Sequence, residues 1–156
     1  MGEILRHCTC FILFYLRDRR KHSLSIHSSF LSMMGQEQFE KIVERAFNRL
    51  PDKFKAAVDN VGVFVEDYPS DEVVNKLKLR SKYYLLGLYQ GIPLTARGTG
   101  YGMNPTPPDK ISLYKKNIEA VCRTDEEVED KICEVLIHEI GHYFGMNEKE
   151  IRAAGF

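Results

Sequence analysis

Hydrophobic residues recur at three- and four-residue spacing in the segment Gln36–Leu50. The repeating positions are Phe39, Ile42, Val43, Ala46, Phe47 and Leu50. This spacing predicts an amphipathic helix with one buried face, which we expect to end at the proline and aspartate of residues 51–52. The next apolar segment, 61–68, is rich in β-branched and aromatic residues and stops before Pro69, which predicts a strand.

Four later segments are less regular. Ser70–Leu79 fits either a short helix or a polar loop. Tyr83–Leu94 is apolar with two glycines, a composition that favours a bent strand and turn over a helix. Arg97–Pro108 contains three glycines and three prolines and is predicted to be a loop, without the GK[ST] ending of a phosphate-binding loop. Ile111–Ile118 alternates imperfectly between apolar and polar residues, as a strand with one wetter face does.

A long helix is predicted near the C-terminal end of the sequence. Thr124 followed three residues later by Glu127 is a capping-box pattern, and we expect the helix to run from there to about Phe144. Apolar residues cover a broad arc of this helix, so it should be deeply buried. They are Val128, Ile132, Cys133, Val135, Leu136, Ile137, Ile140, Tyr143 and Phe144.

Length and periodicity bound the domain organisation. A chain of 156 residues is long enough for one core and too short for two sizeable ones. Residues 1–33 mix short apolar, basic and Ser/His-rich pieces with no pattern that would bury a face. We therefore predict a single domain over residues 34–156. Residues 1–33 are either a disordered extension or the product of an upstream start codon, because Met33 and Met34 precede the first helix.

Charge and cysteine usage narrow the classes of partner and compartment. Lysine plus arginine and aspartate plus glutamate both total 22, so no global field attracts nucleic acid, and a nucleic-acid partner is not expected. The apolar run Cys8–Leu16 is too short to span a membrane, and basic residues rather than a cleavage site follow it. The cysteines lack both disulfide-scaffold density and zinc-finger spacing. We expect a cytoplasmic protein.

The long predicted helix carries an HExxH motif, His138-Glu139-Ile140-Gly141-His142. Residues four apart lie one turn apart on the same helix face, so His138 and His142 can bind one metal ion. Glu139 projects about 100° away, outside the ligand pair, where a general base acting on water would stand. The alternative is that both histidines are ordinary polar residues at the margin of a packed helix. A zinc-like ion would satisfy all three groups, whereas burying them without a partner is costly.

A third ligand is needed, because a catalytic zinc usually has three protein ligands and one open position. Gly145 can reverse the chain in a left-handed conformation and bring Glu148 towards His142. Asn147 is a suitable cap for a final helix with Glu150 at its third position, which places Glu148 in the first turn. Glu148 is therefore the candidate third ligand, and Glu150 is a weaker one. The alternative for Glu148 is a first-turn acid that only stabilises the helix dipole.

The stretch HEIGHYFGMNEKEI resembles the small bacterial zincin-like metallopeptidases, whose motif is HExxHxxGxxD. The upstream stretches FEKIVERAFNRLP, NVGVFVEDYP, LLGLYQGIPL and ISLYKKNI are similar to successive blocks of that family, so the resemblance covers about residues 36–156. It implies a single compact α+β zincin-like domain, in which a small sheet packs against the long helix, with one zinc ion, His138 and His142 as ligands, and Glu139 as the catalytic acid/base. Glu148 stands where the family has aspartate and is one methylene longer.

The motif and the resemblance together predict zinc-dependent hydrolysis of a peptide or protein substrate. Zinc would activate a water, and Glu139 would take its proton and pass it to the leaving amine. We expect an extended peptide to lie along an edge strand at residues 111–118, beside the loop at 97–108. The candidate oxyanion donors are Tyr101, Tyr114 and Tyr143, of which Tyr143 fits the core better. The alternative is a catalytically inactive zincin-like protein that serves as a binding scaffold. The sequence leaves open whether the protein forms a homodimer.

Overall fold

Helices precede, separate and follow the three strands of one small sheet. The computed structural model describes residues 34–58, 61–98 and 108–154. In chain order the helices and strands are α2 (Gln36–Arg49), α3 (Asp52–Ala57), β1 (Val61–Glu66), α4 (Asp71–Lys76), β2 (Gly87–Gln90), β3 (Asp109–Tyr114), α5 (Lys115–Glu119), α6 (Asp125–Tyr143) and α7 (Glu148–Ala153). The predicted extension 1–33 and most of the predicted loop 97–108 lie outside the described residues.

The sheet has three strands in the order β1-β3-β2. β3 runs parallel to β1, with Val61 opposite Asp109, and antiparallel to β2, with Gly87 opposite Leu113. As the central strand, β3 has five of its six residues buried. The predicted α+β fold, with a small sheet packed against one long helix, is confirmed.

The predicted strand at residues 111–118 is wrong in its second half, because Lys115–Glu119 forms helix α5. The predicted wetter face is wrong too, since almost all of β3 is buried. Asn117 accounts for the change: its Nδ2 donates to the carbonyl oxygens of Lys82 and Leu85, each at 2.7 Å. This contact anchors α5 against the turn that leads into β2. Alternation over eight residues is too short to distinguish one strand from a strand followed by a helical turn.

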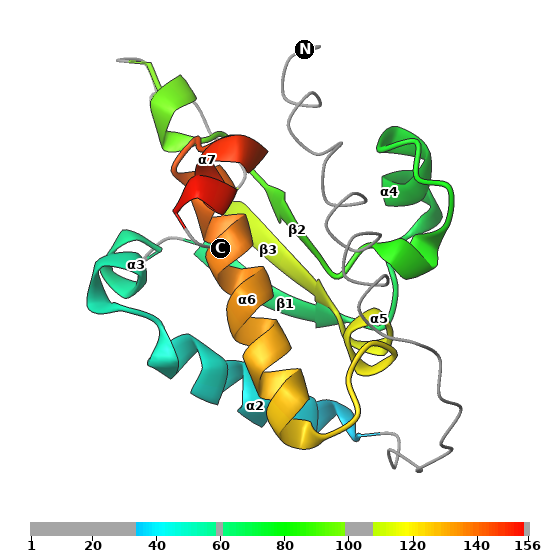
Figure 1. The fold of residues 1–156 in the computed structure, drawn as a ribbon. Coiled ribbons are helices and arrows are strands. Elements are labelled where there is room, and N and C mark those ends of the chain that lie inside the picture. The colour runs from blue at the N-terminus through cyan, green and yellow to red at the C-terminus, as the bar shows by residue number, and fades with distance from the viewer. Residues whose placement is uncertain (1–33, 59–60, 99–107, 155–156) are drawn as a thin grey trace.

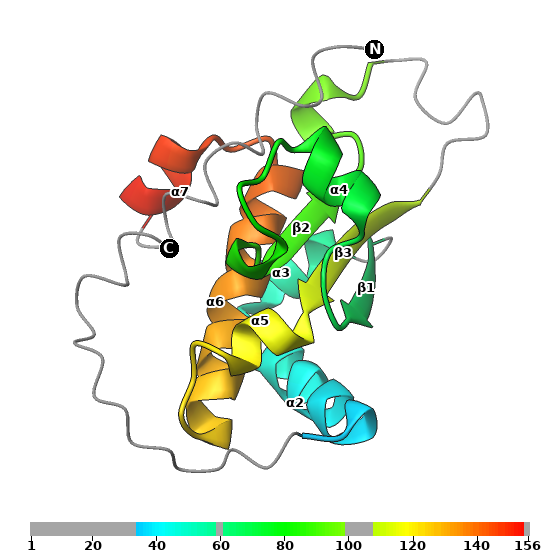
Figure 2. The ribbon, with the colours of Figure 1, turned by 90° about the vertical axis from the view of Figure 1, so that its right-hand side faces the viewer.

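The sheet lies between two layers of helices. α2 and α6 pack together against one side, and α4 lies on the opposite side (Figure 1 and Figure 2). Gly87 allows β2 to approach α6 closely, because a Cβ at this position would lie 2.5 Å from Val135 Cγ1. The C-terminal half of α6 is thereby held directly against the strand next to it.

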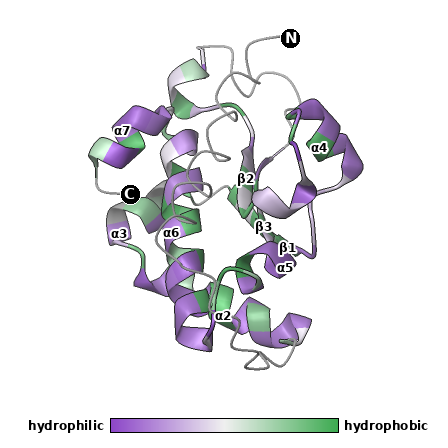
Figure 3. Cartoon of the chain, turned by 45° about the vertical axis from the view of Figure 1, so that its right-hand side comes forward, coloured by the Kyte–Doolittle hydropathy of each residue, from purple (hydrophilic) through white to green (hydrophobic). Residues whose placement is uncertain are grey.

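Apolar side chains of α2, α6 and the strands form the core, as the periodic segments predict. The buried residues of α2 are Phe39, Ile42, Val43 and Ala46. The buried large apolar residues of α6 are Val128, Ile132, Val135, Leu136, Ile140 and Tyr143. α6 starts at its predicted cap, where Thr124 Oγ1 accepts the N–H of Glu127 at 3.1 Å. Figure 3 shows hydrophobic residues along these elements, whereas α4 and α7 are largely hydrophilic.

The segments with less regular patterns are short elements. Within 70–79 the chain forms α4, which Ser70 Oγ caps by accepting a backbone N–H at 3.3 Å. Within Tyr83–Leu94 it forms β2, flanked by 3₁₀ turns at Lys82–Tyr84 and Leu94–Ala96. Among the described residues, no helix has both the length and the apolar content that a bilayer crossing requires.

Candidate metal centre

The last turns of α6 carry both histidines of the HExxH motif. Their Nε2 atoms lie 3.2 Å apart, and the rings meet edge to face with centroids 4.9 Å apart. The one-turn spacing therefore brings two ring nitrogens to one point, as expected from the sequence. His138 is only 3% exposed and is therefore deeply buried, and the side chain of His142 is 11% exposed.

A tight turn ends α6 and reverses the chain. Gly145 has a φ of +83°, the left-handed conformation predicted for it. Its N–H donates to the carbonyl oxygen of His142 at 2.9 Å, and the N–H of Met146 donates to the carbonyl oxygen of Gly141 at 3.0 Å. This pair of bonds is a Schellman motif, which satisfies the last carbonyl groups of α6. The turn returns the chain towards the two histidines.

Helix α7 begins directly after this turn. Asn147 Oδ1 accepts the backbone N–H groups of Lys149 and Glu150 at 3.0 and 3.1 Å, and Glu150 Oε2 accepts the N–H of Asn147 at 2.7 Å. The predicted cap is therefore confirmed, and the carboxylate of Glu150 is engaged in it. Glu148, the first residue of α7, directs its carboxylate to the histidine pair instead.

The three side chains converge on one point. Glu148 Oε1 lies 3.1 Å from His138 Nε2 and 3.2 Å from His142 Nε2. With the 3.2 Å between the nitrogens, the three atoms form a nearly equilateral triangle. Ligand atoms of a tetrahedral zinc site with bonds of about 2.0–2.1 Å lie about 3.3–3.4 Å apart. The donor atoms and their spacing fit one face of that tetrahedron, and these residues form a group that could hold a metal ion.

Neighbouring groups orient this triangle. His142 Nδ1 lies 3.2 Å from the carbonyl oxygen of Met146, and the tautomer that donates to it directs the Nε2 lone pair inwards. Burial raises the pKa of the Glu148 carboxyl, but hydrogen bonds from the two histidines outweigh burial and hold that pKa well below its usual range. Burial lowers the pKa of His142, and the carboxylates of Glu148 and Glu139 raise it by more. The centre therefore favours an anionic carboxylate beside positive charge.

Glu139 lies beside the triangle and is 2% exposed. Its Oε2 accepts the backbone N–H of Tyr89 on β2 at 2.6 Å. Its Oε1 is buried and has no hydrogen-bond partner among the described residues. Burial raises the pKa of the Glu139 carboxyl, and the positive charge of the two histidines opposes this rise without cancelling it. One oxygen is thus held by the sheet, and the other has no partner within the described part of the chain.

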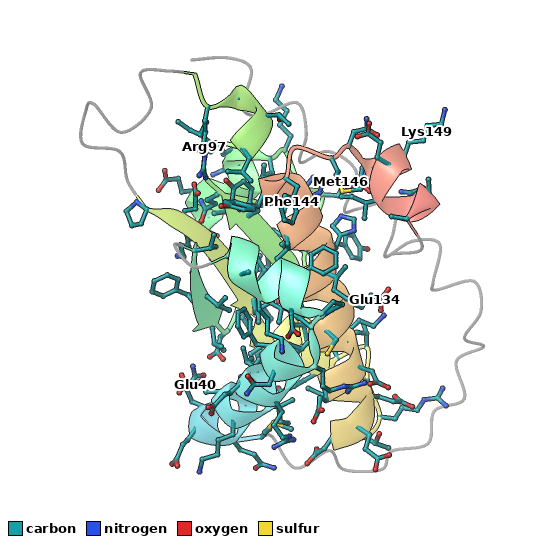
Figure 4. All side chains as sticks on the ribbon, turned by 90° about the vertical axis from the view of Figure 1, so that its left-hand side faces the viewer. Glu40, Arg97, Glu134, Phe144, Met146 and Lys149 are labelled. Carbon is teal, nitrogen blue, oxygen red and sulfur yellow. The ribbon has the colours of Figure 1, made fainter. Side chains whose placement is uncertain are left out.

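The loop after β2 packs against the end of α6. Asp109, at the start of β3 and 4% exposed, accepts the N–H of Ile92 at 3.2 Å and forms an ion pair with Arg97. The guanidinium carbon of Arg97 lies 5.0 Å from the centre of the Tyr143 ring. Figure 4 shows Arg97 and Phe144 at the same end of the molecule, where α6 gives way to α7. The loop is therefore tied both to β3 and to the helix that carries the histidines.

Two supports of this centre could not be predicted from the sequence: the N–H of Tyr89 and the ion pair between Asp109 and Arg97. Any residue except proline offers a backbone N–H, so the identity of Tyr89 carries no signal. The ion pair joins residues at the two ends of a predicted loop, where charged side chains are ordinarily solvated. Only the depth of Asp109 in the fold distinguishes this pair from surface charges.

Other predicted site residues lie elsewhere. Tyr114 is 1% exposed within the core and is not available to a substrate, and Tyr143 is buried as predicted. Tyr101 lies outside the described residues. The predicted placement of a peptide along residues 111–118 is wrong, because β3 is the central strand and both of its edges are already paired.

Known proteins to which this chain is similar define its family. Residues 58–155 match the model of the zincin-like metallopeptidase family, and the chain therefore belongs to that family. No curated protein matches it. A solved structure, that of a conserved hypothetical protein from Thermus thermophilus, is similar with a TM-score of 0.48 and 23% identity, over 78% of this chain and 98% of that chain. The resemblance to zincin-like metallopeptidases is confirmed by the family match.

Proposed function

We propose that this protein is a zinc-dependent metallopeptidase in which His138, His142 and Glu148 bind one zinc ion. The observation that carries the proposal is the triangle of two Nε2 atoms and one carboxylate oxygen, with sides of 3.1, 3.2 and 3.2 Å. Three protein ligands leave a fourth position for water or substrate, as in catalytic zinc sites. Membership of the zincin-like metallopeptidase family supports a peptide or protein as the substrate.

The residues around the triangle suit amide hydrolysis. When bound, zinc supplies a Lewis acid that lowers the pKa of water towards about 7 and polarises a carbonyl group. The N–H of Tyr89 holds Glu139 Oε2, which leaves Oε1 to accept a proton from the attacking water. As the water oxygen bonds to the carbonyl carbon and the C–N bond breaks, Glu139 returns that proton to the leaving amine. Glu139 therefore carries one proton through the reaction and ends unchanged.

The first experiment measures zinc and hydrolysis in the same samples. Zinc content is determined by elemental analysis for the full chain and for His138→Ala and His142→Ala. Hydrolysis is followed on a mixture of unrelated peptides by mass spectrometry. We expect near-stoichiometric zinc in the wild type, its loss in both histidine variants, and cleavage only by zinc-loaded protein. A wild type that takes up no zinc even when it is supplied would end the proposal.

Glu139→Gln separates catalysis from metal binding. We expect this variant to retain zinc, because Glu139 is not a ligand in the proposed site, and to lose at least about 100-fold in the rate of cleavage, since glutamine cannot carry the proton. Glu134→Gln on the same helix is the matched control, because the Glu134 carboxylate pairs with Lys131 away from the triangle, and it should keep full activity. Cleavage by Glu139→Gln at the wild-type rate would exclude the assigned role.

A catalytically inactive binding scaffold is the second candidate. The observation that favours it is the depth of the site: His138 is 3% exposed and Glu139 is 2% exposed, so a substrate has little surface to reach. A scaffold would bind zinc as firmly as a peptidase but would cleave no peptide in the mixture. Its cellular function would also be unaffected by Glu139→Gln, whereas the function of a peptidase would be lost.

A further inference from the structure

Gly141, between the two histidines, lies on the part of α6 that α7 covers. A Cβ at this position would lie 2.8 Å from Ile151 Cγ1 and 2.9 Å from Ile151 Cδ1, closer than side chains normally approach. The Cβ of Ile151 itself would be 3.9 Å away, an ordinary contact distance. Ile151 therefore inserts into the space that a side chain at residue 141 would occupy.

Ile151 is the main apolar attachment of α7 to the rest of the fold. It is 1% exposed and is the one buried residue of this six-residue helix. Figure 1 shows α7 as a short helix beside the C-terminal end of α6. The Schellman turn and the contact of Glu148 with the histidines also link the two helices. The contact between Ile151 and Gly141 therefore determines how closely α7 approaches α6.

We propose that Gly141 is a positioning residue for the metal centre: its lack of a side chain lets Ile151 seat α7 at the depth at which Glu148 reaches both histidines. This inference rests on the proposed role of Glu148 as a zinc ligand. Gly141 lies one turn from His138 and next to His142, whereas Ile151 lies three residues from Glu148, so both helices meet at the contact on the side of the ligands. A displacement of α7 by a fraction of an ångström at this contact moves the carboxylate away from the triangle.

The proposal predicts opposite effects of one methyl group on α6 and on the metal centre. Alanine is a better helix former than glycine, so Gly141→Ala should leave the core helix as stable as before or more stable. The same methyl group should push Ile151 and α7 outwards and weaken zinc binding about 10- to 100-fold, the usual range when a group that orients a metal ligand is lost. A residue with only a structural role would change both properties in the same direction.

Zinc affinity in a double-mutant cycle tests the contact. Dissociation constants are measured by competition with a chromophoric chelator for wild type, Gly141→Ala, Ile151→Ala and the double variant. Ile151→Ala removes Cγ1 and Cδ1, so the added methyl group at residue 141 then meets only a Cβ at about the 3.9 Å of ordinary contact. We expect the double variant to bind zinc more tightly than either single variant. Gly35→Ala, where a Cβ would meet nothing within 4 Å, is the matched control and should bind as wild type does.

Hydrogen exchange of metal-free protein makes the test independent of zinc. In Gly141→Ala the amides of Ile151 and Ala154, bonded within α7 at 3.0 Å, should exchange faster, while amides in the first turns of α6 should not, and the double variant should recover part of the lost protection. Unchanged protection, additive losses in the cycle, or a fall in the melting temperature of metal-free Gly141→Ala would overturn the proposal. If wild type bound no zinc, the proposed function would fail, and exchange alone would still decide whether Gly141 seats α7.

Discussion

At the scale of single residues, the centre depends on the position of one carboxylate oxygen. Glu148 Oε1 contacts the Nε2 atoms of both histidines, whereas Oε2 lies 3.6 Å from Arg152 Nη2. The motif that this stretch resembles, HExxHxxGxxD, has aspartate at this position, and the glutamate side chain is one methylene longer. A longer ligand side chain reaches the same point from a helix that stands further away, so the residue type and the seat of α7 are linked.

Shortening or neutralising Glu148 should therefore weaken zinc binding by different routes. Glu148→Gln keeps the length and removes the charge, and we expect its zinc dissociation constant to rise about 10- to 100-fold. Glu148→Asp keeps the charge but withdraws the oxygen, and because the contact of Ile151 with Gly141 fixes the position of α7, its zinc dissociation constant should rise as well. Glu150→Gln is the control, because the carboxylate of Glu150 accepts the N–H of Asn147 in the cap. A larger loss of affinity in Glu150→Gln than in Glu148→Gln would transfer the ligand role to Glu150.

The convergence of His138, His142 and Glu148 could be predicted from the sequence because each step is local. Helical spacing brings the histidines together, and the glycine, cap and first-turn signals after α6 lie within ten residues. The depth of the site could not be predicted. Glu139 is buried because β2, fifty residues earlier in the chain, lies over it and donates the N–H of Tyr89.

At the scale of elements, the loop after β2 holds the end of α6 in place. Asp109 begins β3, accepts the N–H of Ile92 and pairs with Arg97, which lies over the ring of Tyr143. One buried carboxylate thus joins the central strand, the loop and the helix that carries the histidines. The loop also contacts the turn before α7, since a Cβ at Gly145 would overlap Thr95.

Removing the Asp109 carboxylate should therefore destabilise more than one element. Asp109→Ala leaves Arg97 and the N–H of Ile92 without this partner, and we expect a loss of about 2–4 kcal/mol in the free energy of unfolding, near the range for broken buried pairs. Urea unfolding followed by circular dichroism measures it. Glu37→Ala removes the carboxylate of an exposed pair with Lys41 and should have no measurable effect. Equal effects of the two substitutions would show that the buried position of Asp109 adds nothing.

The long helices were predictable, whereas helix α5 and the central place of β3 in the sheet were not, for one physical reason. α2 and α6 repeat a buried face over several turns, so their own residues determine the pattern. α5 has five residues and is helical because Asn117 bonds to the turn before β2. β3 is central because β1 and β2 pair with its two edges. A segment of eight residues does not indicate which distant strands will pair with it.

At the scale of the whole molecule, the apolar core and the candidate metal centre occupy different parts of the fold. The core lies between the sheet and helices α2 and α6, and the sheet and both helices contribute buried apolar residues to it. The centre lies beyond it, where the end of α6 meets α7, and α7 contributes one buried residue. The fold therefore has its own hydrophobic stabilisation before any metal binds, unlike small domains that fold only around zinc.

Metal removal should accordingly lower the stability of the protein without unfolding it. At a free zinc concentration of about 100 times the dissociation constant, binding stabilises the folded state by about 2.7 kcal/mol, which corresponds to a rise in melting temperature of roughly 10 °C for a domain of this size. We expect chelator-treated protein to keep its far-ultraviolet circular dichroism at 25 °C and to melt earlier by about that amount. His142→Ala should melt at one temperature with or without zinc, because two of the three donor atoms remain and cannot hold the ion firmly. Loss of secondary structure on chelation at 25 °C would mean that the core depends on the metal centre, and an unchanged melting temperature in the wild type would mean that zinc does not bind the folded chain.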